Sequence, residues 1–411
     1  MRILIVTQYF WPENFRINDM AVAMKERGHE VTVFTGMPNY PEGKLFKGYH
    51  WFWPRKQNYN GVKVYRVPII PRGKGRHWEL VLNYLSFVFF ACLLFPFYSI
   101  GKRFDAILTF QTTPITVALP AILLKKLKRA PLFLWVQDLW PESLAAVGAV
   151  KSPHLLAWVS KLVKFIYNHC DKILMQSRAF AGHIKTLGQL NEKLAYLPNW
   201  AENYYQPLAP EQVDEKIRSE FPSGFSILFA GNLGVAQSLE SILSSANTLR
   251  GYSDIHWVIV GEGRQREWFI SEIIKQDLSD KVHWLGSRSP ELMPQYFACA
   301  DVLLVTLRRD PIFALTIPSK LQSYLACGRP IVAAIDGEGA RVIDESGAGI
   351  AVPAEDHESL SNAILELYQE SSDRREKRGA RGYRYYHDQF ARDTLLTLLE
   401  RLFKEQQAKQ K

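Results

Sequence analysis

The chain has 411 residues, of which 47% are hydrophobic and 22% are charged, and it contains four cysteines. This composition excludes fibrous and disordered proteins, and the length suits two domains that each bury their own core. The cysteines show no Cys-x-x-Cys spacing, which argues against a zinc site or a disulfide framework and favours a reducing cytoplasm.

Positive charge is concentrated in the first half of the chain. Residues 1–200 hold 26 lysines and arginines against 11 acidic residues, a net charge of +15, whereas the remaining residues hold 24 against 30, a net charge of −6. The first half therefore favours an anionic partner, which means phosphate groups, nucleic acid or an anionic membrane surface.

Short apolar runs alternate with amphipathic runs of helical length along the first half. The apolar runs predict strands at residues 3–7, 30–36, 62–67, 105–110, 131–138 and 172–177. Helices are expected between them, notably at Asn18–Gly28 and Pro153–Cys170. The first run is shorter than the apolar region of about 7–15 residues in a secretory signal, so it is interpreted as a buried strand. The alternation indicates a parallel sheet covered on both faces.

The second half repeats this alternation after a proline-containing break at residues 198–210, which is interpreted as an interdomain linker. Its strands are expected at residues 225–231, 256–263, 281–287, 301–307, 330–335 and 348–352. Its helices are expected at residues 238–249, 264–276, 290–298 and 359–370, and residues 374–411 are expected to form one long helix. The sequence therefore predicts two doubly wound α/β domains, with the ligand site in the cleft beyond the carboxyl ends of their strands.

One segment of the first half, Trp78–Ile100, is apolar for nearly the ~20 residues that span a bilayer. Basic residues precede it (Arg72, Lys74 and Arg76) and follow it (Lys102 and Arg103). Glu79, Asn83 and Ser86 interrupt it. Three interpretations stay open: a helix on the membrane surface, a fully buried helix and a true span. The basic flanks at both ends favour the surface helix.

Three segments of the second half have the character of phosphate-binding turns. The sequence IPSKLQSYLACGRPIV, residues 317–332, runs from a Pro318-Ser319-Lys320 turn into a helix that ends at Gly328. Pro318 suits the first turn, Ser319 is expected to cap it, and free amides beside a lysine favour a phosphate-bearing ligand. Glycines at residues 231, 234, 261 and 263 end two strands, where they allow close approach to backbone amides. Together these segments predict a nucleotide diphosphate site without metal ligands.

In the first half, Asp138 stands at the end of a predicted strand, beside Trp140 and Glu142. A carboxylate in this place can orient or deprotonate an attacking hydroxyl, or it can cap the following helix, and both interpretations stay open. The segments WPENFRIN (residues 11–18) and MPNYP (residues 37–41) follow other strands of the same sheet and mix amide, aromatic and cationic groups. Such groups suit the recognition of a sugar or a phosphate.

Over essentially its whole length the chain resembles the GT-B glycosyltransferases of family 4. The matching segments include RILIVTQYFWPEN, RGHEVTVFTG, ILFAGNLGVAQSLE, VIVGEG and PSKLQSYLACGRPIV. Within the family, WPENFRIND, PNYPEGK, QDLWPESL and AGNLGVAQSLE look most similar to bacterial N-acetyl-L-fucosaminyltransferases of O-antigen and capsule assembly. The resemblance implies a sugar-binding cleft between an acceptor domain, residues 1–200 with residues 386–411 packing back on it, and a donor domain, residues 201–385.

The resemblance also implies roles for particular residues. Asp138 and Lys320 are the expected catalytic residues, with Lys320 stabilising the leaving phosphate. The expected donor-binding residues are Gly231, Asn232, Leu233, Gly234, Gln237, Gly261, Gly263, Arg264, Leu285, Ser319, Lys320 and Leu321. The expected acceptor-binding residues are Asn14, Arg16, Asn18, Asn39, Tyr40, Trp140 and Glu142. No metal, cofactor or nucleic acid is expected.

The chain also departs from the family pattern. Leu315 and Ser323 stand where family members commonly carry two glutamates, and Asn232 and Gln237 stand where an arginine and a lysine often grip the diphosphate. Lys320 is therefore the main expected cation at the diphosphate. Retention of anomeric configuration is expected from family membership, and the missing glutamates leave it open.

The expected reaction moves N-acetyl-L-fucosamine from UDP to a polyprenyl-diphosphate-linked saccharide. It takes place on the cytoplasmic face of the inner membrane, with peripheral contact through residues 72–103. Three alternatives remain: transfer of a fucosyl or mannosyl group from a GDP- or UDP-sugar, sugar-nucleotide 2-epimerisation without an acceptor, and a non-catalytic sugar-nucleotide-binding partner. A nicotinamide oxidoreductase is disfavoured, because neither half carries the dinucleotide fingerprint.

Overall fold

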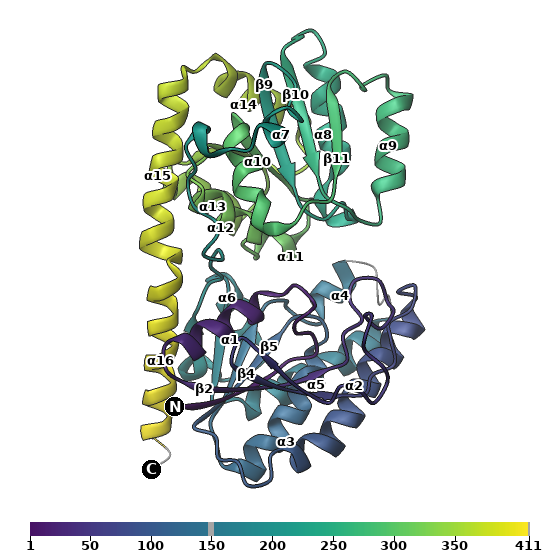
Figure 1. Ribbon diagram of the computed structural model, residues 1–411, viewed down its shortest axis with the longest axis vertical. Helices are drawn as coiled ribbons and strands as arrows, with labels where there is room; N and C mark the ends of the chain where they lie inside the picture. Colours follow the sequence, from purple (N-terminus) through teal and green to yellow (C-terminus); the bar gives the residue numbers. More distant parts are fainter. Residues whose placement is uncertain (147–151, 410–411) are drawn as a thin grey trace. The chain divides into compact units, whose positions relative to one another are not determined.

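The computed structural model describes residues 1–146 and 152–409, which form two compact units (Figure 1). The N-terminal unit comprises Met1–Pro198 and Asp393–Lys411, and the C-terminal unit comprises Asn199–Arg392. The chain therefore passes from one unit to the other after Pro198, and it returns at residue 393 rather than at the expected residue 386.

The N-terminal unit is built on an eight-stranded sheet with the order β3-β4-β2-β1-β5-β6-β7-β8. Only the pairing of β3 with β4 is antiparallel among its described strands. The strands are β1 (Arg2–Val6), β2 (Glu30–Gly36), β3 (Lys56–Tyr59), β4 (Val62–Val67), β5 (Ala106–Gln111), β6 (Leu132–Val136), β7 (Lys172–Met175) and β8 (Leu194–Tyr196). β5 and β6 are buried along their whole length, as expected for parallel strands covered on both faces. The edge strands β3 and β8 were not predicted.

Helices follow most of these strands in the usual β-α alternation. They are α1 (Arg16–Glu26), α2 (His77–Tyr98), α3 (Ala118–Lys128), α4 (Glu142–Ala146), α5 (Pro153–His169), α6 (Phe180–Thr186) and the C-terminal α16 (Arg392–Ala408). The sequence at the start of α5 explains why the helix begins there: Ser152 accepts a hydrogen bond from the amide of Leu155, and Pro153 occupies the first turn. The helix α3 lies between β5 and β6, where the alternation of strands and helices led us to expect a helix.

The helix α2 contains the apolar segment, and the interpretation as a fully buried helix is wrong. Asn83, Ser86, Phe87, Ala91 and Phe95 face the interior. Its opposite side is exposed to solvent, and the exposed side chains are Trp78, Val81, Leu82, Leu85, Phe89, Leu93 and Phe97. In the described part of the chain, α2 is the one helix long and apolar enough to cross a membrane. Of its most apolar stretch of 18 residues, 28% is buried.

The C-terminal unit is built on a six-stranded parallel sheet with the order β11-β10-β9-β12-β13-β14. Its strands are β9 (Phe225–Ala230), β10 (Ile255–Val260), β11 (Val282–Gly286), β12 (Val302–Thr306), β13 (Ile331–Ala334) and β14 (Gly349–Val352). Its helices are α7 (Glu215–Arg218), α8 (Leu239–Thr248), α9 (Arg266–Lys275), α10 (Met293–Cys299), α11 (Pro311–Ala314), α12 (Ser319–Ala326), α13 (Glu338–Ser346), α14 (His357–Gln369) and α15 (Ser372–Phe390). Both units are therefore doubly wound α/β domains, which confirms the predicted fold class.

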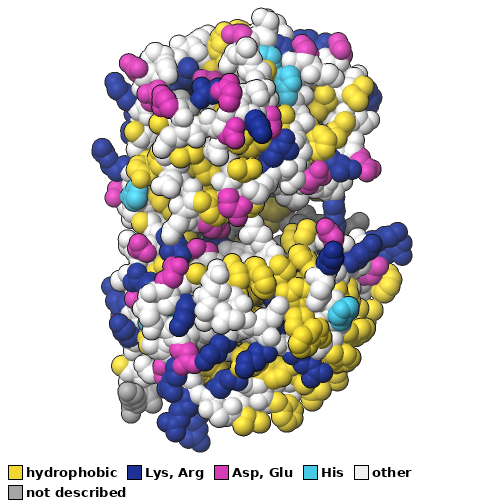
Figure 2. All heavy atoms as spheres, viewed as in Figure 1, with side chains coloured by type: hydrophobic (Ala, Val, Ile, Leu, Met, Phe, Trp, Pro, Cys, Tyr) yellow, Lys and Arg dark blue, Asp and Glu magenta, His cyan; other side chains and the backbone are white. Residues whose placement is uncertain are grey.

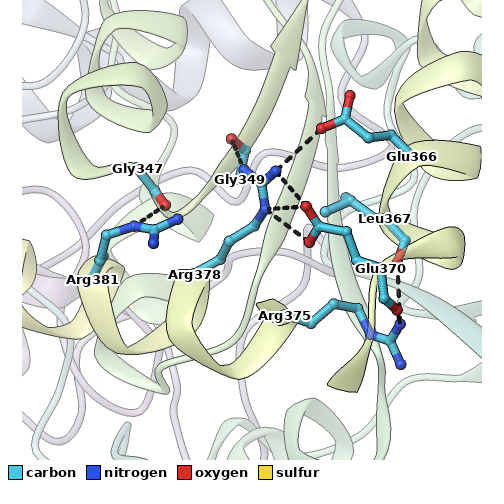
Figure 3. Close-up of polar contacts among 8 residues, drawn as sticks. All are labelled: Gly347, Gly349, Glu366, Leu367, Glu370, Arg375, Arg378 and Arg381. Carbon is cyan, nitrogen blue, oxygen red and sulfur yellow. Dashed lines mark hydrogen bonds and ion pairs between the residues drawn. The ribbon is translucent and has the colours of Figure 1, made fainter. Parts of the chain in front are cut away.

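The basic helix α15 is fastened to the C-terminal unit by its arginines (Figure 3). Arg378 pairs with Glu370 at 2.7 Å and with Glu366 at 3.2 Å, and Arg381 donates to the carbonyl of Gly347. Residues 374–411 are not one helix, as expected from the sequence, because Ala391 leaves the helical conformation (φ −57°, ψ 123°) between α15 and α16.

The strand orders place the topological switch point between β1 and β5 in the N-terminal unit and between β9 and β12 in the C-terminal unit. In doubly wound sheets the loops at the carboxyl ends of such strand pairs bind ligands. The loops after β1, β5, β9 and β12 are therefore where sites are expected in each unit.

Candidate functional site

The loops after β9 and β10 pack closely against each other at the carboxyl edge of the C-terminal sheet. The amide of Gly231 donates to the carbonyl of Val260 at 2.9 Å, and the amide of Leu233 donates to the carbonyl of Glu262 at 2.8 Å. A Cβ atom on Gly261 would lie 1.8 Å from the carbonyl oxygen of Gly231. A Cβ atom on Gly263 would lie 2.3 Å from the carbonyl oxygen of Leu233. These two glycines therefore make room for the neighbouring loop, a role in packing that differs from the close approach to a phosphate expected from the sequence.

Lys320, in the first turn of α12, reaches into the loop after β9. Its Nζ donates to Oε1 of Gln237 at 2.6 Å and lies 3.4 Å from the ring centroid of Phe229. Gln237 ends a short 3₁₀ turn, Val235–Gln237, in the same loop. The chain therefore brings a cation from α12 to the side chain of Gln237, the residue that stands where the resembled family often has a lysine.

The surroundings of the Lys320 ammonium shift its protonation. Removal of the ammonium from water disfavours the charged form, and it lowers the pKa of Lys320 well below its usual value. Gln237 and the ring of Phe229 are neutral partners, which supply a hydrogen bond and a negative ring face but no counter-charge. An anionic ligand beside this lysine would supply the missing counter-charge and favour the ammonium form.

The turn before α12 differs from the expected one. Pro318 occupies the N-cap position and Ser319 is the first helical residue, so Ser319 does not cap the helix. The side chain of Leu321 is fully buried in the core of the C-terminal unit, and its amide donates to the carbonyl of Pro318 at 3.0 Å. Of the three residues expected at the diphosphate, Lys320 therefore reaches the loop, Ser319 is exposed beside it and Leu321 serves the core.

The other expected donor-binding residues lie at the same edge of the sheet with different exposures. Asn232 and Arg264 are exposed, Gly234 is half-buried, and Leu285 is a half-buried residue packed against the core. Ser323, which replaces a family glutamate, is buried within hydrogen-bond reach of Tyr205, whereas Leu315 is half-buried.

The structure adds residues that the sequence analysis did not single out. The indole of Trp284, in β11, donates to the carbonyl of Gly261 at 3.0 Å and so supports the loop after β10. Arg308 and Arg309 follow β12, the strand next to β9, and both side chains are partly exposed. Arg308 lies 3.4 Å from Glu240, and Arg309 donates to the carbonyl of Ala354. Two consecutive arginines directly after a predicted strand were the available signal.

In the N-terminal unit, Asp138 follows β6 and meets Thr113, which follows the adjacent β5. The Thr113 hydroxyl donates to Oδ2 of Asp138 at 3.0 Å, and the indole of Trp140 donates to the same hydroxyl oxygen at 3.4 Å. Burial raises the pKa of the Asp138 carboxyl, and the hydrogen bond from Thr113 opposes that rise. The interpretation as a cap of the following helix is not supported, because the side-chain partner of Asp138 is Thr113.

Two of the expected acceptor residues, Asn18 and Asn39, serve the structure of their own loops. Asn18 accepts from the amide of Trp11 and donates to the carbonyl of Glu13. Asn39 is fully buried; it donates to the carbonyl of Met37 and accepts from the Arg72 amide and the Asn83 side chain. In each residue, both the oxygen and the nitrogen of the side-chain amide are hydrogen-bonded within the protein. Direct contact of Asn18 or Asn39 with an acceptor is therefore not supported.

Glu13 is the centre of this loop network and was not predicted as a site residue. Its carboxylate accepts from the amides of Asn39 and Tyr40 at 2.8 Å and from the amide of Phe10 at 3.1 Å. Burial of the carboxyl raises its pKa to about 7, against the lowering effect of these hydrogen bonds. The loops after β1 and β2 are therefore joined by one buried acid.

The remaining expected acceptor residues differ in exposure. Asn14 is exposed, and Arg16 is half-buried at the start of α1. The ring of Tyr40 lies 5.3 Å from that of Phe15, and the Arg72 guanidinium lies over its face at 4.9 Å from the centroid. Trp140 is buried beside Asp138, and Oε2 of Glu142 lies 3.0 Å from Nε2 of His183. Among the described residues there is no group of three His, Cys, Asp or Glu side chains that could hold a metal ion.

Each unit matches a known protein family. Residues 14–200 match a family described as "Glycosyl transferase 4-like domain", and residues 224–370 match one described as "Glycosyl transferases group 1". The chain carries the two domains of a glycosyltransferase. Asp138 therefore belongs to the domain that matches the first family, and Lys320 belongs to the domain that matches the second.

Two curated relatives and one solved structure are similar to this glycosyltransferase. It is 27% identical over 275 residues to a Pseudomonas aeruginosa protein named as the glycosyltransferase WbjE, which covers 65% of this chain and 67% of the relative. It is 25% identical over 339 residues to an Escherichia coli K12 protein named as the colanic acid biosynthesis glycosyl transferase WcaI, which covers 80% and 82%. The crystal structure of Anabaena HepE in complex with UDP superposes with a TM-score of 0.71 at 15% identity, over 98% of this chain and 100% of HepE. The last likeness supports the GT-B fold.

Proposed function

We propose that this glycosyltransferase moves N-acetyl-L-fucosamine from UDP to a hydroxyl group of a polyprenyl-diphosphate-linked saccharide, in the synthesis of a bacterial surface polysaccharide. The observation that carries the proposal is the meeting of Lys320 and Gln237 in the glycine-containing loop after β9. Lys320 and the diphosphate of a nucleotide sugar are complementary, because an anion restores the charged form that its surroundings disfavour.

Within this proposal Lys320 and Asp138 have separate tasks. The hydroxyl oxygen of the acceptor forms a bond to the anomeric carbon while the bond from that carbon to the diphosphate oxygen breaks. Lys320 stabilises the negative charge that develops on the departing diphosphate. Asp138, with a pKa raised by burial, orients the hydroxyl group and takes up its proton. Retention of anomeric configuration is part of the proposal, by resemblance to family 4.

The choice of sugar and acceptor rests on similarity. The motifs WPENFRIND, PNYPEGK, QDLWPESL and AGNLGVAQSLE support N-acetyl-L-fucosamine. The name of WcaI supports polysaccharide synthesis, and the UDP in the HepE complex supports a UDP-linked donor. A 6-deoxy sugar also lacks a hydroxyl group that a glutamate would otherwise hold, which is compatible with Leu315 at the position of a family glutamate.

The proposal includes peripheral contact with the cytoplasmic face of the membrane through residues 72–103. The exposed apolar side of α2 and the basic residues before it support this contact, because apolar area and cations both favour an anionic bilayer surface. The hydrogen bonds of Asn83 with Gln8 and with the carbonyl of Ile70 hold the inner side of α2 on its own unit, which favours a surface helix over a span.

Saturation-transfer NMR of the purified protein against UDP-, GDP- and dTDP-sugars tests the donor. Preferential saturation of UDP-N-acetyl-L-fucosamine is expected, and the Lys320→Met variant should lose most of it. Preference for a GDP-sugar would replace the donor with a fucosyl or mannosyl nucleotide. Incubation with donor alone and with a lipid-linked acceptor then separates the rivals: product without acceptor indicates an epimerase, and binding without turnover under any acceptor indicates a non-catalytic partner.

A further inference from the structure

The two ends of α2 differ in the partners of their basic side chains. At the C-terminal end, Nζ of Lys102 donates to the carbonyl of Tyr98 and lies 4.3 Å from the ring centroid of Tyr65. Lys102 is therefore engaged with its own chain, and Arg103 is the exposed cation there. At the N-terminal end, Lys74 and Arg76 are exposed and Arg72 is half-buried. Three cations within five residues thus stand at one end of the apolar helix.

The backbone of the segment that carries these three cations is fixed from the inside. The amide of Arg72 donates to Oδ1 of Asn39 at 3.1 Å, and the amide of Gly73 donates to the carbonyl of Gly43 at 3.0 Å. A Cβ atom on Gly43 would lie 1.6 Å from the carbonyl oxygen of Gly73, so the two turns are in close contact. The amide of Arg76 donates to Glu79 at 2.9 Å. These hydrogen bonds fix the backbone of the segment before any ligand binds. The binding of an anion by its three cations therefore costs less conformational entropy.

Arg72 joins this segment to the aromatic residues of the loops after β1 and β2. Its guanidinium lies 4.9 Å from the ring centroid of Tyr40, and the rings of Tyr9, Phe15 and Tyr40 contact one another at 5.3 to 5.6 Å. These rings belong to the loops after β1 and β2, which also carry the expected acceptor-binding residues Asn14, Arg16 and Tyr40. A guanidinium is suited to bind phosphate oxygens in a bidentate manner while it stacks on an aromatic ring.

The apolar side of α2 extends away from Arg72. The exposed residues Trp78, Leu82, Leu85, Phe89, Leu93 and Phe97 recur every three or four positions, so they form one stripe along the helix. A helix of 22 residues is about 33 Å long, which is comparable to the thickness of a bilayer core. Figure 2 shows hydrophobic side chains gathered on the side of the N-terminal unit where Figure 1 labels α2 and α5. Leu155, Trp158 and Phe165 of α5 are also exposed.

We propose that Arg72, with Lys74 and Arg76, binds the diphosphate of an isoprenoid-diphosphate acceptor whose hydrocarbon chain lies along the apolar side of α2. Charged neighbours of this segment include Glu79, which caps α2, and Glu42 and Lys44, which flank Gly43 in the sequence, so the local balance stays positive. The inference rests on the proposed function, because it assigns the head group of the proposed acceptor to named residues. In a general membrane contact, the cations at the two ends of α2 would be equivalent. In this proposal, only the cations at the N-terminal end bind the diphosphate.

Binding of the full chain to neutral phosphatidylcholine vesicles tests the proposal without donor or catalysis. One set contains a few mole per cent of undecaprenyl diphosphate, and a second set contains phosphatidylglycerol at equal charge. We expect at least fivefold more protein on the first set, and competition by inorganic pyrophosphate. Arg72→Gln should abolish this preference, whereas the matched control Arg103→Gln should keep it. Thermal melting monitors the folding of both variants.

Each result decides one question. Equal binding of the wild type to both sets, or a preserved preference in Arg72→Gln, would overturn the assignment of the diphosphate to Arg72. Donor saturation by NMR involves the C-terminal unit and no lipid, so its failure would overturn the proposed donor and leave the vesicle result standing. A lost vesicle preference together with intact donor binding would overturn only the present inference.

Discussion

A Cβ atom on Gly231 would lie 2.5 Å from Cε of Lys320, so the missing side chain of the glycine makes room for the lysine. The φ angle of Gly231 is 147°, a conformation that L-residues rarely adopt. The small residue that ends β9 and the cation on α12 are therefore parts of one arrangement, although 89 positions separate them in the sequence.

Substitution Gly231→Ala should weaken donor binding by displacing Lys320 and Gln237. We expect a loss of about tenfold in affinity for UDP, equivalent to about 1.4 kcal/mol, and a destabilisation of about 1 kcal/mol from the backbone strain. Isothermal titration calorimetry with UDP and thermal melting measure the two effects. Gly251→Ala is the matched control in the same unit, since a Cβ atom there meets nothing within 4 Å. Unchanged UDP affinity in Gly231→Ala would contradict the role of this pair.

Substitution Lys320→Met should separate catalysis from stability. We expect kcat to fall by about 10²–10³-fold, because the departing diphosphate loses its cation. The pKa of Lys320 is lowered in the folded state, so the unfolded chain binds the proton more readily and this residue destabilises the fold as the pH falls below about 10.5. Removal of the amine should therefore raise the melting temperature more at pH 6 than at pH 9.

The exposed Lys275 on α9 provides the control for this pH effect. Lys275→Met should change the melting temperature little at either pH, because the Lys275 side chain lies at the surface, where its ion pair with Glu272 contributes little to stability. If Lys320→Met lowered the melting temperature equally at pH 6 and pH 9, desolvation of Lys320 would not destabilise the folded protein in the way proposed.

Substitutions at Asp138 and Thr113 test the proposed base. Asp138→Asn should lower kcat by about 10²–10⁴-fold with little change in donor binding. Thr113→Val removes the hydrogen bond that opposes the raised pKa of Asp138, so the acid limb of the pH profile of kcat/KM should move to higher pH. Thr113→Ser keeps a hydroxyl group and should restore the wild-type profile. Full activity of Asp138→Asn would exclude Asp138 as the base.

The architecture was predictable from the sequence because parallel strands covered on both faces are continuous apolar runs, as Ile3–Val6 and Ile227–Phe229 illustrate. The polar edge strand β3, Lys56–Tyr59, carries no such signal. The break at Ala391 was also hidden, since neither proline nor glycine marks it.

The candidate site was predictable in part. A lysine beside the start of a helix identified Lys320, but its contact with Gln237 depends on how α12 packs beside β9. Asn18 and Asn39 have the chemistry of ligand-binding residues, and only the structure shows that their amides are hydrogen-bonded to neighbouring loops. The buried state of Glu13 was equally inaccessible, because nothing local distinguishes it from an exposed acid such as Glu26.

Glu13 should make the stability of the N-terminal unit depend on pH. Its folded pKa of about 7 lies above the ordinary value of 4.5, so the native state binds the proton more tightly than the unfolded chain. The contribution of Glu13 to the free energy of unfolding should therefore decrease as the pH rises from about 4.5 to about 7 and stay constant above that range. Urea unfolding of the wild type and of Glu13→Gln across this range measures the difference.

The stability of the wild type relative to Glu13→Gln should decline between pH 4.5 and pH 7. The glutamine also places an amide group opposite one of the backbone donors that the carboxylate accepts, which should cost about 1–3 kcal/mol at every pH. Glu26→Gln, at an exposed position on α1, is the matched control and should change the free energy of unfolding little. A difference between the wild type and Glu13→Gln that does not vary with pH would show that Glu13 titrates as an ordinary carboxyl, and would leave only its role as an acceptor for the two loops.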